Sequence, residues 1–308
     1  MSEEEMLIIK VPGSTANLGP GFDSVGLALA IYLTLEVEKG DRYEVIPLSE
    51  NLNAFPKDET NFVFQIALDT AAKYNKKLPT CRVRMNSDIP LARGLGSSAA
   101  AIVAGIELAD SLCGLHLTKQ EKLERASMIE GHPDNVGASL FGGLVVGCQL
   151  EEVSVVTFHQ LELDIVAVVP KEELLTKESR GLLPKTLLYQ EAVQAGAIGN
   201  VLIAAILKQN FKLAGKMMKA DRYHHPYRKE IVPHLAQIEE MAPDLGAFGV
   251  ALSGAGPTVL CLVEKGKGTF LAEELSKALP EMKYLRLKID QTGSKVYSSL
   301  VSEICPSN

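Results

Sequence analysis

The residues with the clearest chemical potential are the glycines and serines of residues 90–110, which read PLARGLGSSAAAIVAGIELAD. Gly94, Gly96, Ser97 and Ser98 stand before a proline-free apolar stretch that predicts a buried helix. We expect Ser97 or Ser98 to be the N-cap, because a hydroxyl oxygen can accept from the N–H groups of the first turn. A helix N-terminus presents unpaired N–H donors and the positive end of a dipole. The loop therefore predicts an anion site, with phosphate as the ligand.

Two common nucleotide loops differ from this one. A Walker A loop closes with Gly-Lys and then Ser or Thr, and that ending is missing here. Gly94, Gly96 and Ala99 match the dinucleotide pattern GxGxxA, but the nearest predicted strand, residues 81–86, does not run directly into Gly94. The remaining alternative is an ordinary glycine-rich turn that caps a core helix, since short motifs of this kind arise readily by chance.

A second polar group occupies residues 130–143, EGHPDNVGASLFGG, between a predicted helix and a predicted strand. No Lys or Arg stands beside Glu130, so its carboxylate, once buried, needs a cation or a hydrogen-bond donor. His132, Asp134 and Asn135 add an imidazole, a carboxylate and an amide. The alternatives are a surface position for Glu130 at a helix end and a structural role in the core for His132.

A third candidate is the loop of residues 14–26, STANLGPGFDSVG. Asn17 and Asp23 place an amide and a carboxylate on a glycine-rich backbone that can pack tightly. The alternative is that both side chains form Asx-turn hydrogen bonds to the loop itself, as Asn and Asp usually do in such loops.

The segment of residues 221–228, DRYHHPYR, is rich in basic and aromatic residues. Neighbouring residues do not share a face of a helix, so His224 and His225 do not predict a metal site. Arg228 stands before Lys229 and Glu230, and on its own it is compatible with a solvated side chain.

Strands and helices in alternation must position these groups. The sequence predicts strands at residues 6–11, 27–37, 81–86, 144–148, 153–158, 163–169, 246–252, 259–263 and 284–289. It predicts helices at residues 62–74, with an N-cap at Thr60–Asn61, from 99 to a stop at Gly114, and at 117–129, 189–195, 198–209, 213–219 and 270–278. Pro12 and Gly13 should end the first strand, and Thr118 with Glu121 predicts a capping box. The glycine-rich segment SGAGPT, residues 253–258, should turn between two strands.

Composition narrows the class of protein. The chain has 308 residues, of which 46% are hydrophobic and 22% are charged, which suits about two globular domains. The net charge of -7 argues against nucleic acid or an anionic membrane as partner. No apolar run approaches the roughly 18 residues of a membrane span, and residues 1–5, MSEEE, do not resemble a signal peptide. The five cysteines are far apart without a CxxC pair, so we expect a soluble cytoplasmic protein.

Several of these segments together resemble the motifs of the GHMP kinases, a superfamily of small-molecule kinases that includes galactose, homoserine and mevalonate kinases. The run PxxxGLGSSAA resembles their phosphate-binding loop, and SGAGP resembles their third motif, whose glycines pack against that loop. ANLGPGFDxxG and HxDNVxxxxxGG resemble the pattern of the homoserine kinase family in particular. The motifs occur in the family's order and span nearly the whole chain. One departure is the single glycine between Glu130 and His132, a shorter link than in some members.

The resemblance implies which residues bind the nucleotide and its metal. Backbone N–H groups of the loop would cradle the phosphates of ATP, and Ser98 and Glu130 would hold Mg2+. The implied nucleotide-binding residues are Asn61, Leu91, Ala92, Arg93, Gly94, Leu95, Gly96, Ser97, Ser98, Ala99, Ala100 and Ala101. Asn61 would lie by the adenine ring.

The resemblance also implies how L-homoserine binds. Asp23 would hold the substrate ammonium, and Asn17 and His132 would lie near the substrate. Arg228 and Arg180, the latter in a TxxxR stretch, would hold the carboxylate, a task that suits a planar guanidinium. For the catalytic region, His132, Asp134 and Asn135 are implied, with Asn135 orienting the hydroxyl, because an amide cannot act as a base at neutral pH.

The fold implied is α+β with two domains. Residues 1–155 would form an ATP-binding domain like the second domain of ribosomal protein S5, and residues 156–308 a ferredoxin-like domain. The activity implied is that of an ATP:L-homoserine O-phosphotransferase of threonine biosynthesis, in a protein that forms homodimers. The alternatives are another GHMP kinase, which would need a different loop from Asn17 to Asp23, and a non-catalytic binding protein, which should have lost Ser98 or Glu130.

Overall fold

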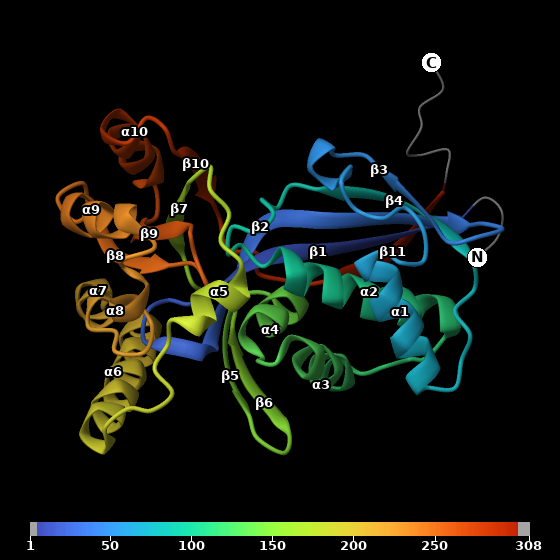
Figure 1. Ribbon diagram of the computed structural model, residues 1–308, viewed down its shortest axis with the longest axis horizontal. Coiled ribbons are helices and arrows are strands. Elements are labelled where there is room, and N and C mark those ends of the chain that lie inside the picture. The colour runs from blue at the N-terminus through green and yellow to red at the C-terminus, as the bar shows by residue number, and fades with distance from the viewer. Residues whose placement is uncertain (1–4, 301–308) are drawn as a thin grey trace.

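Two antiparallel-rich sheets form the two lobes of the molecule (Figure 1). The structure is a computed structural model that describes residues 5–300. The first sheet contains β1 (Glu5–Asn17), β2 (Gly21–Lys39), β3 (Glu44–Pro47), β4 (Cys81–Ser87), β5 (Leu144–Gln149), β6 (Val153–Phe158) and β11 (Lys295–Leu300). The second contains β7 (Leu163–Val169), β8 (Ala247–Leu252), β9 (Val259–Glu264) and β10 (Lys283–Leu287) in the order β10-β7-β9-β8. The predicted mixture of helices and sheets in two lobes is confirmed.

Helices cover these sheets and build the core between the lobes. In the first lobe they are α1 (Phe62–Lys73), α2 (Ser97–Cys113), α3 (Lys119–Glu130) and α4 (Asp134–Phe141), and a short 3-10 turn, η1, spans Glu50–Leu52. The later ones are α5 (Thr176–Gly181), α6 (Tyr189–Leu207), α7 (Phe211–Lys219), α8 (His225–Arg228), α9 (Pro233–Met241) and α10 (Gly268–Ala278). Side chains of β7 alternate between two cores, since Val166 and Val168 face α9 and α10 while Ile165 and Ala167 join the large core shared with the first lobe.

The first hairpin differs from its prediction. Pro12 and Gly13 do not end β1, which continues to Asn17 with register shifts after Pro12 and after Ala16. Such a shift lets a strand accommodate a proline that cannot donate to the ladder. The expected loop of residues 14–26 is therefore mostly strand, and its turn is confined to residues 18–20. This turn reaches from the first lobe to α7 and α8 of the second (Figure 1).

Three helix starts were predicted, two of them correctly. Asn61 caps α1 by accepting from the N–H of Val63, and Thr118 and Glu121 form the predicted capping box of α3. At α2, however, the N-cap is Gly96, with φ 74° and no side-chain cap bond, rather than Ser97 or Ser98. The left-handed conformation of Gly96 starts the helix one residue earlier and leaves both serines inside its first turn.

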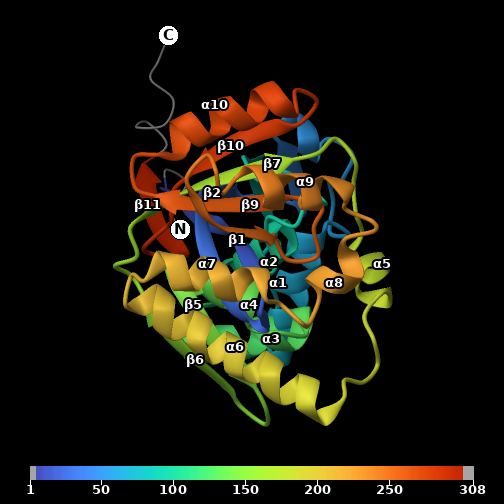
Figure 2. The same ribbon diagram turned by 90° about the vertical axis from the view of Figure 1, so that its left-hand side faces the viewer.

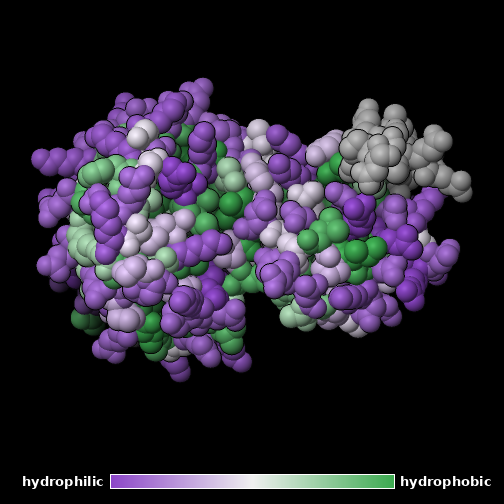
Figure 3. All heavy atoms as spheres, turned by 90° about the horizontal axis from the view of Figure 1, so that it is seen from above, coloured by the Kyte–Doolittle hydropathy of each residue, from purple (hydrophilic) through white to green (hydrophobic). Residues whose placement is uncertain are grey.

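Sheet pairing differs from the predicted division at residue 155. β6 crosses that position and pairs with β5, and β11 returns from the far end of the chain to pair with β1. The sheet of the first lobe therefore contains chain from both predicted halves, whereas the sheet of the second lobe comes entirely from the second half. Seen from above, the lobes form two masses with a notch between them, and mostly hydrophilic atoms at the surface (Figure 3).

α6 is one continuous helix where two were predicted. It has 19 residues and a mean hydropathy of 1.3, so by length and composition alone it could cross a membrane, contrary to the expectation that no such segment exists. Its buried side chains Leu202, Ala205 and Ile206 belong to the large core, and it packs beside α7 (Figure 2). Only 22% of the residues in its apolar stretch are buried, so much of the helix faces outward.

Candidate active site

A cleft between the lobes gathers most of the residues singled out from the sequence. It is lined by the β1–β2 turn, the loop before α2, the α3–α4 junction, α5, α8 and the loop after β8. The predicted residues among its lining are Asn17, Asp23, Ala92, Gly94, Gly96, Ser97, Ser98, Glu130, His132, Asp134, Asn135, Arg180 and Arg228. Residues more than 200 positions apart in the chain thus meet at one place.

Other predicted nucleotide residues do not line this cleft. Leu95, Ala99 and Ala100 are fully buried under the loop and support it as core. The Arg93 guanidinium donates to the carbonyls of Pro170 and Lys171 and so ties the loop to the second lobe. The list of predicted residues outside the cleft lining is Asn61, Leu91, Arg93, Leu95, Ala99, Ala100 and Ala101. Asn61 serves as the cap of α1, with its amide group donating to Pro56.

The loop before α2 is held by two neighbouring segments. The N–H of Ser14 donates to the carbonyl of Leu95, and the hydroxyl of Ser253 donates to the carbonyl of Gly94 at 2.5 Å. Gly94 and Gly96 both have φ 74°, and a Cβ on Gly94 would lie 2.2 Å from the Ser253 carbonyl oxygen. Because the carbonyls are used on the protein side, the N–H groups at the start of α2 are left for a ligand in the cleft.

Ser98 and Glu130 lie face to face at the mouth of this loop. The Ser98 hydroxyl is 3.4 Å from Oε2 of Glu130, and this is the only hydrogen bond of that carboxylate within residues 5–300. Burial raises the pKa of Glu130 above its ordinary value. A hydroxyl and a carboxylate are the hard oxygen donors that Mg2+ prefers. The donor set therefore fits a divalent cation, which would also relieve the burial of the Glu130 charge.

His132, Asp134 and Asn135 form a connected group at the start of α4. Nδ1 of His132 is 2.5 Å from Oδ1 of the buried Asp134, which also accepts from the backbone N–H of Asn135 at 2.6 Å. Burial acts to lower the pKa of His132, but the hydrogen bond and charge of Asp134 outweigh it and raise that pKa. Asp134 is therefore already occupied by two donors. Oδ1 of Asn135 accepts from Ser14 at 3.0 Å, which fixes the amide at the cleft wall.

Asp23, His132 and Asp134 also bring one possible ligand atom each to within 4.8 Å of one another. The nitrogen of His132 that points into this group already shares the hydrogen bond with Asp134. A metal ion there would have to displace that bond, so Ser98 and Glu130 remain the better-suited pair.

The charged residues at the other end of the cleft pair with each other. Arg180 donates to Asp23 through both terminal nitrogens, at 2.6 and 3.0 Å, and the bond to Asp23 raises the pKa of Arg180. Phe22 lies between the two arginines, with its ring centroid 5.5 Å from the Arg180 guanidinium and 5.6 Å from that of Arg228. Asn17 donates to the carbonyl of Gly254 and accepts from the N–H of Asp23, six residues further along the chain, so its side chain ties the hairpin to the loop after β8 and does not form an Asx-turn.

Arg228 is not the solvated side chain that the sequence alone allowed. It is 1% exposed, and burial lowers its pKa to about 10, with the charge of Arg180 adding to the effect. Its guanidinium donates to Gly254 at 3.1 Å and to the ring of His224 at 3.0 Å. The reason given for the neighbouring histidines does not hold, because ring nitrogens of His224 and His225 do converge, and they lie within 4.8 Å of each other and of a carboxylate oxygen of Asp221.

Some residues of this site were not singled out from the sequence. Phe22, Ser14, Ser253 and His224 contact the predicted residues directly. Ser253 opens the SGAGPT turn and Ser14 opens the candidate loop of residues 14–26, so the motifs pointed to the neighbourhood of both serines without singling out either side chain. His224 was considered only as a metal ligand. It is the N-cap residue of α8 and stands four positions before Arg228, a spacing at which side chains on a helix can meet.

Comparisons with known proteins show the family to which the chain belongs. Residues 61–143 match the model of the GHMP kinases N-terminal domain, and residues 202–281 match that of the GHMP kinases C-terminal domain. Homoserine kinases from Bacillus velezensis and Halalkalibacterium halodurans are each 50% identical to the chain, over 99% and 96% of both sequences respectively.

Solved structures give the same result. The crystal structure of homoserine kinase from Cytophaga hutchinsonii superposes with a TM-score of 0.83 at 25% identity, covering 96% of this chain and 98% of that one. The mevalonate kinase of Methanococcus jannaschii has the same fold, with a TM-score of 0.69 at 20% identity over 92% of this chain and 98% of that one.

Proposed function

Because the chain belongs to the homoserine kinases of the GHMP family, we propose that its cleft binds ATP at the loop before α2 and L-homoserine beside Asp23 and Arg228. The enzyme transfers the γ-phosphoryl group of ATP to the side-chain hydroxyl of L-homoserine, a step of threonine biosynthesis. The observation that carries the site assignment is the meeting of a phosphate loop, a hydroxyl–carboxylate pair and two arginines in one cleft.

The nucleotide end of the cleft is built for anionic oxygens. The unpaired N–H groups at the start of α2 would bind the phosphates of ATP. Ser98 and Glu130 would hold the divalent metal ion, for which we propose Mg2+. When bound, this ion offsets the negative charge that builds on the transferred phosphoryl group. Asn61, the N-cap of α1, would lie beside the adenine ring.

The acceptor end of the cleft is built for a zwitterion. The substrate ammonium would bind Asp23, and the substrate carboxylate would bind Arg180 and Arg228. In the structure the Asp23–Arg180 pair occupies that place, so the ammonium and carboxylate would enter by replacing the two halves of an internal ion pair. Because both partners regain an opposite charge, the exchange avoids leaving a desolvated charge unpaired.

Positioning would account for much of the rate. Asn135, held by Ser14, would orient the substrate hydroxyl toward the γ-phosphorus, while Asp134 keeps His132 in place. We favour Asn135 over Asp134 for this role, since the Asp134 carboxylate is buried and already accepts from two donors.

Separate substitutions of Asn135 and Asp134 distinguish orientation of the substrate hydroxyl from general-base catalysis. We expect Asn135→Ala to lower kcat about 100-fold through misplacement of the hydroxyl. Asp134→Asn should retain measurable turnover, because no proton passes through it. Steady-state kinetics of both purified variants provides the measurement. Abolished turnover in Asp134→Asn together with normal turnover in Asn135→Ala would reject the assignment.

The function is tested by measuring ADP release with Mg-ATP and five acceptors: L-homoserine, L-serine, mevalonate, galactose and shikimate. Turnover with L-homoserine alone supports the acceptor site of Asp23, Arg180 and Arg228. Turnover with a different acceptor would keep the phosphate loop and reject those substrate residues. ATP binding without any turnover would indicate a non-catalytic member of the fold.

We infer further that the enzyme is a homodimer. Tyr189, Val193, Ala197 and Val201 follow one another at four-residue spacing along α6 and are all exposed, with Tyr189 at 86% and Val193 at 55%. An exposed apolar helix face of this kind suits burial against a second copy. We expect light scattering to give twice the 33.2 kDa of one chain, and Val193→Glu to give a single-chain mass with its turnover reported alongside.

We also place the enzyme in the cytoplasm. The four cysteines that the structure describes, Cys81, Cys113, Cys148 and Cys261, are all unbridged, which is typical of a reducing compartment.

A further inference from the structure

The orientation of Arg228 depends on a small number of contacts. Its Nη1 donates to the carbonyl of Gly254 at 3.1 Å and to Nδ1 of His224 at 3.0 Å, and its Nε lies 3.4 Å from the carbonyl of Ser179. No acceptor for Nη2 is found within residues 5–300, and Arg228 lines the cleft. The guanidinium is thus anchored on one side and has donors left for a ligand on the other.

His224 is the one side chain in that anchor. It is completely buried, and its second ring nitrogen, Nε2, lies 3.0 Å from the carbonyl oxygen of Gly19. A carbonyl requires a donor and an arginine requires an acceptor, so the ring must carry its proton on Nε2 and none on Nδ1. Burial lowers the pKa of His224 well below its ordinary value, with His225 and Arg228 adding to the effect, which agrees with a neutral ring.

Gly19 connects the His224 ring to the part of the cleft proposed to bind the substrate ammonium. It lies in the turn between β1 and β2, four residues before Asp23, and its Cα region packs against the backbone of Met218. The Phe22 ring also packs on His224, with centroids 5.4 Å apart. One imidazole therefore contacts both the arginine for the carboxylate and the turn that precedes the acid for the ammonium.

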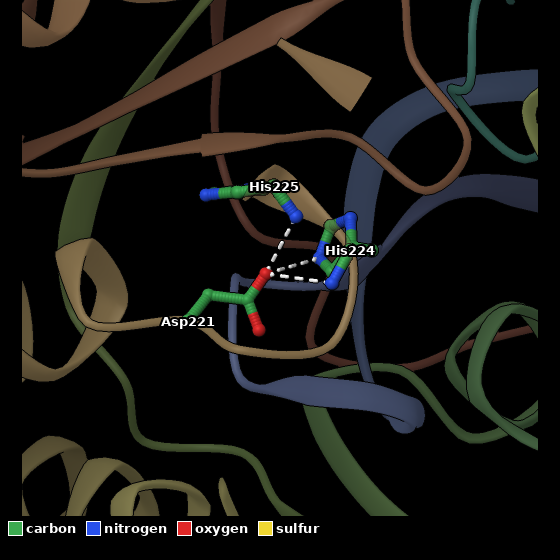
Figure 4. Close-up of side chains that lie close together, drawn as sticks. All are labelled: Asp221, His224 and His225. Atoms are coloured by element: carbon green, nitrogen blue, oxygen red, sulfur yellow. Dashed lines mark hydrogen bonds and ion pairs between the residues drawn. The ribbon is translucent and has the colours of Figure 1, made fainter. Parts of the chain in front are cut away.

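Asp221 holds the histidine in place rather than completing a metal site. Its carboxylate accepts from the backbone N–H groups of Tyr223, His224 and His225, at 2.8, 3.1 and 2.7 Å, and faces both rings (Figure 4). Nε2 of His225 accepts from the N–H of Leu252 at 3.0 Å. Since these atoms already have partners, the group of Asp221, His224 and His225 is a structural clamp.

We propose that His224 is a positioning residue for substrate recognition, which sets the spacing between Arg228 and the β1–β2 turn that precedes Asp23. This spacing selects an acceptor that has both a carboxylate and an ammonium. This inference rests on the proposed function, because it concerns how the same cleft recognises its acceptor. It predicts that a change at His224 acts on the carboxylate contact and leaves the nucleotide end unaffected.

Two substitutions separate the two contacts of the ring. His224→Asn keeps an acceptor near the position of Nδ1, whereas His224→Gln keeps a donor near the position of Nε2. His225→Gln is the matched control, since it changes an adjacent buried histidine that does not contact Arg228. The readout is kcat/KM for L-homoserine divided by kcat/KM for 3-amino-1-propanol, which has the same ammonium and hydroxyl but lacks the carboxylate.

We expect His224→Gln to lower this ratio at least tenfold with KM for ATP within twofold of the unaltered enzyme. His224→Asn should keep the ratio within threefold, and His225→Gln should leave it unchanged whatever it does to the melting temperature. An unchanged ratio in His224→Gln, or an equal loss in His225→Gln, would overturn the inference. If His224→Gln does not fold, a tenfold loss in His224→Asn overturns it instead. Absence of L-homoserine turnover in the unaltered enzyme would overturn the proposed function, and this inference with it.

Discussion

Replacing Glu130 by Gln is expected to lower kcat for homoserine phosphorylation about 10³-fold, the scale on which single electrostatic groups act in active sites. Gln keeps the shape and one oxygen of the side chain but removes the charge that a divalent cation requires beside Ser98. KM for Mg2+ should rise together with the fall in kcat. The measurement is steady-state ADP release with the Mg2+ concentration varied at fixed ATP.

The same substitution should not destabilise the protein. Burial raises the pKa of Glu130, so its charged form is disfavoured in the folded state, and a neutral amide avoids that cost near neutral pH. Urea unfolding without ligands should therefore give an unfolding free energy equal to or above that of the unaltered protein. The exposed Glu240→Gln serves as control and should change neither quantity. Normal Mg2+ dependence in Glu130→Gln would show that the metal binds elsewhere.

Substituting Gly96 by Ala should both destabilise the protein and remove turnover. A Cβ at this position would lie 2.3 Å from Oγ and 2.6 Å from N of Ser14, and the residue has φ 74°. Overpacking and a left-handed alanine together cost about 3 kcal/mol. Because Ser14 also holds Asn135, the displacement should reach both the phosphate loop and the acceptor hydroxyl. We expect kcat/KM to fall more than 100-fold, since small misplacements at a reacting centre have effects of this size.

Gly266→Ala isolates the conformational part of that effect. Gly266 has φ 90°, but a Cβ there would meet nothing within 4 Å. It should cost about 1 kcal/mol in urea unfolding and leave turnover unchanged. If Gly96→Ala were no more damaging than Gly266→Ala, the close approach of the loop to Ser14 would not matter for catalysis.

Local patterns in the sequence predicted local structure well. The capping box of Thr118 and Glu121, the cap at Asn61 and the stop at Gly114 are all found in the structure, because each depends on residues a few positions apart. The helix that follows the glycine-rich loop was predicted for the same reason, although its cap is Gly96. Whether glycine or serine caps α2 is decided by Ser14, which lies about 80 residues earlier and leaves no room for a Cβ.

Properties that depend on distant contacts could not be derived from local sequence. Nothing near Arg228 indicates that its charge is buried, since the acceptors Gly254 and Ser179 come from other segments. Nothing near Asp23 indicates its pairing with Arg180, which is 157 residues away. The resemblance to a family supplied the convergence of these residues, whereas the partners that hold them became visible only in three dimensions.

The pairing of β11 with β1 affects how the protein is made. β1 pairs with β11 through residues Glu5–Lys10, which leave the ribosome almost 300 residues before their partners at Lys295–Leu300. During synthesis the outer edge of β1 therefore presents unpaired backbone groups, a surface prone to pairing with other nascent chains. β2 can protect only the inner edge at that stage. Completion of the ATP-binding lobe must await the last strand, so truncated chains should be cleared by proteases as unfinished products and should not accumulate as partly active enzyme.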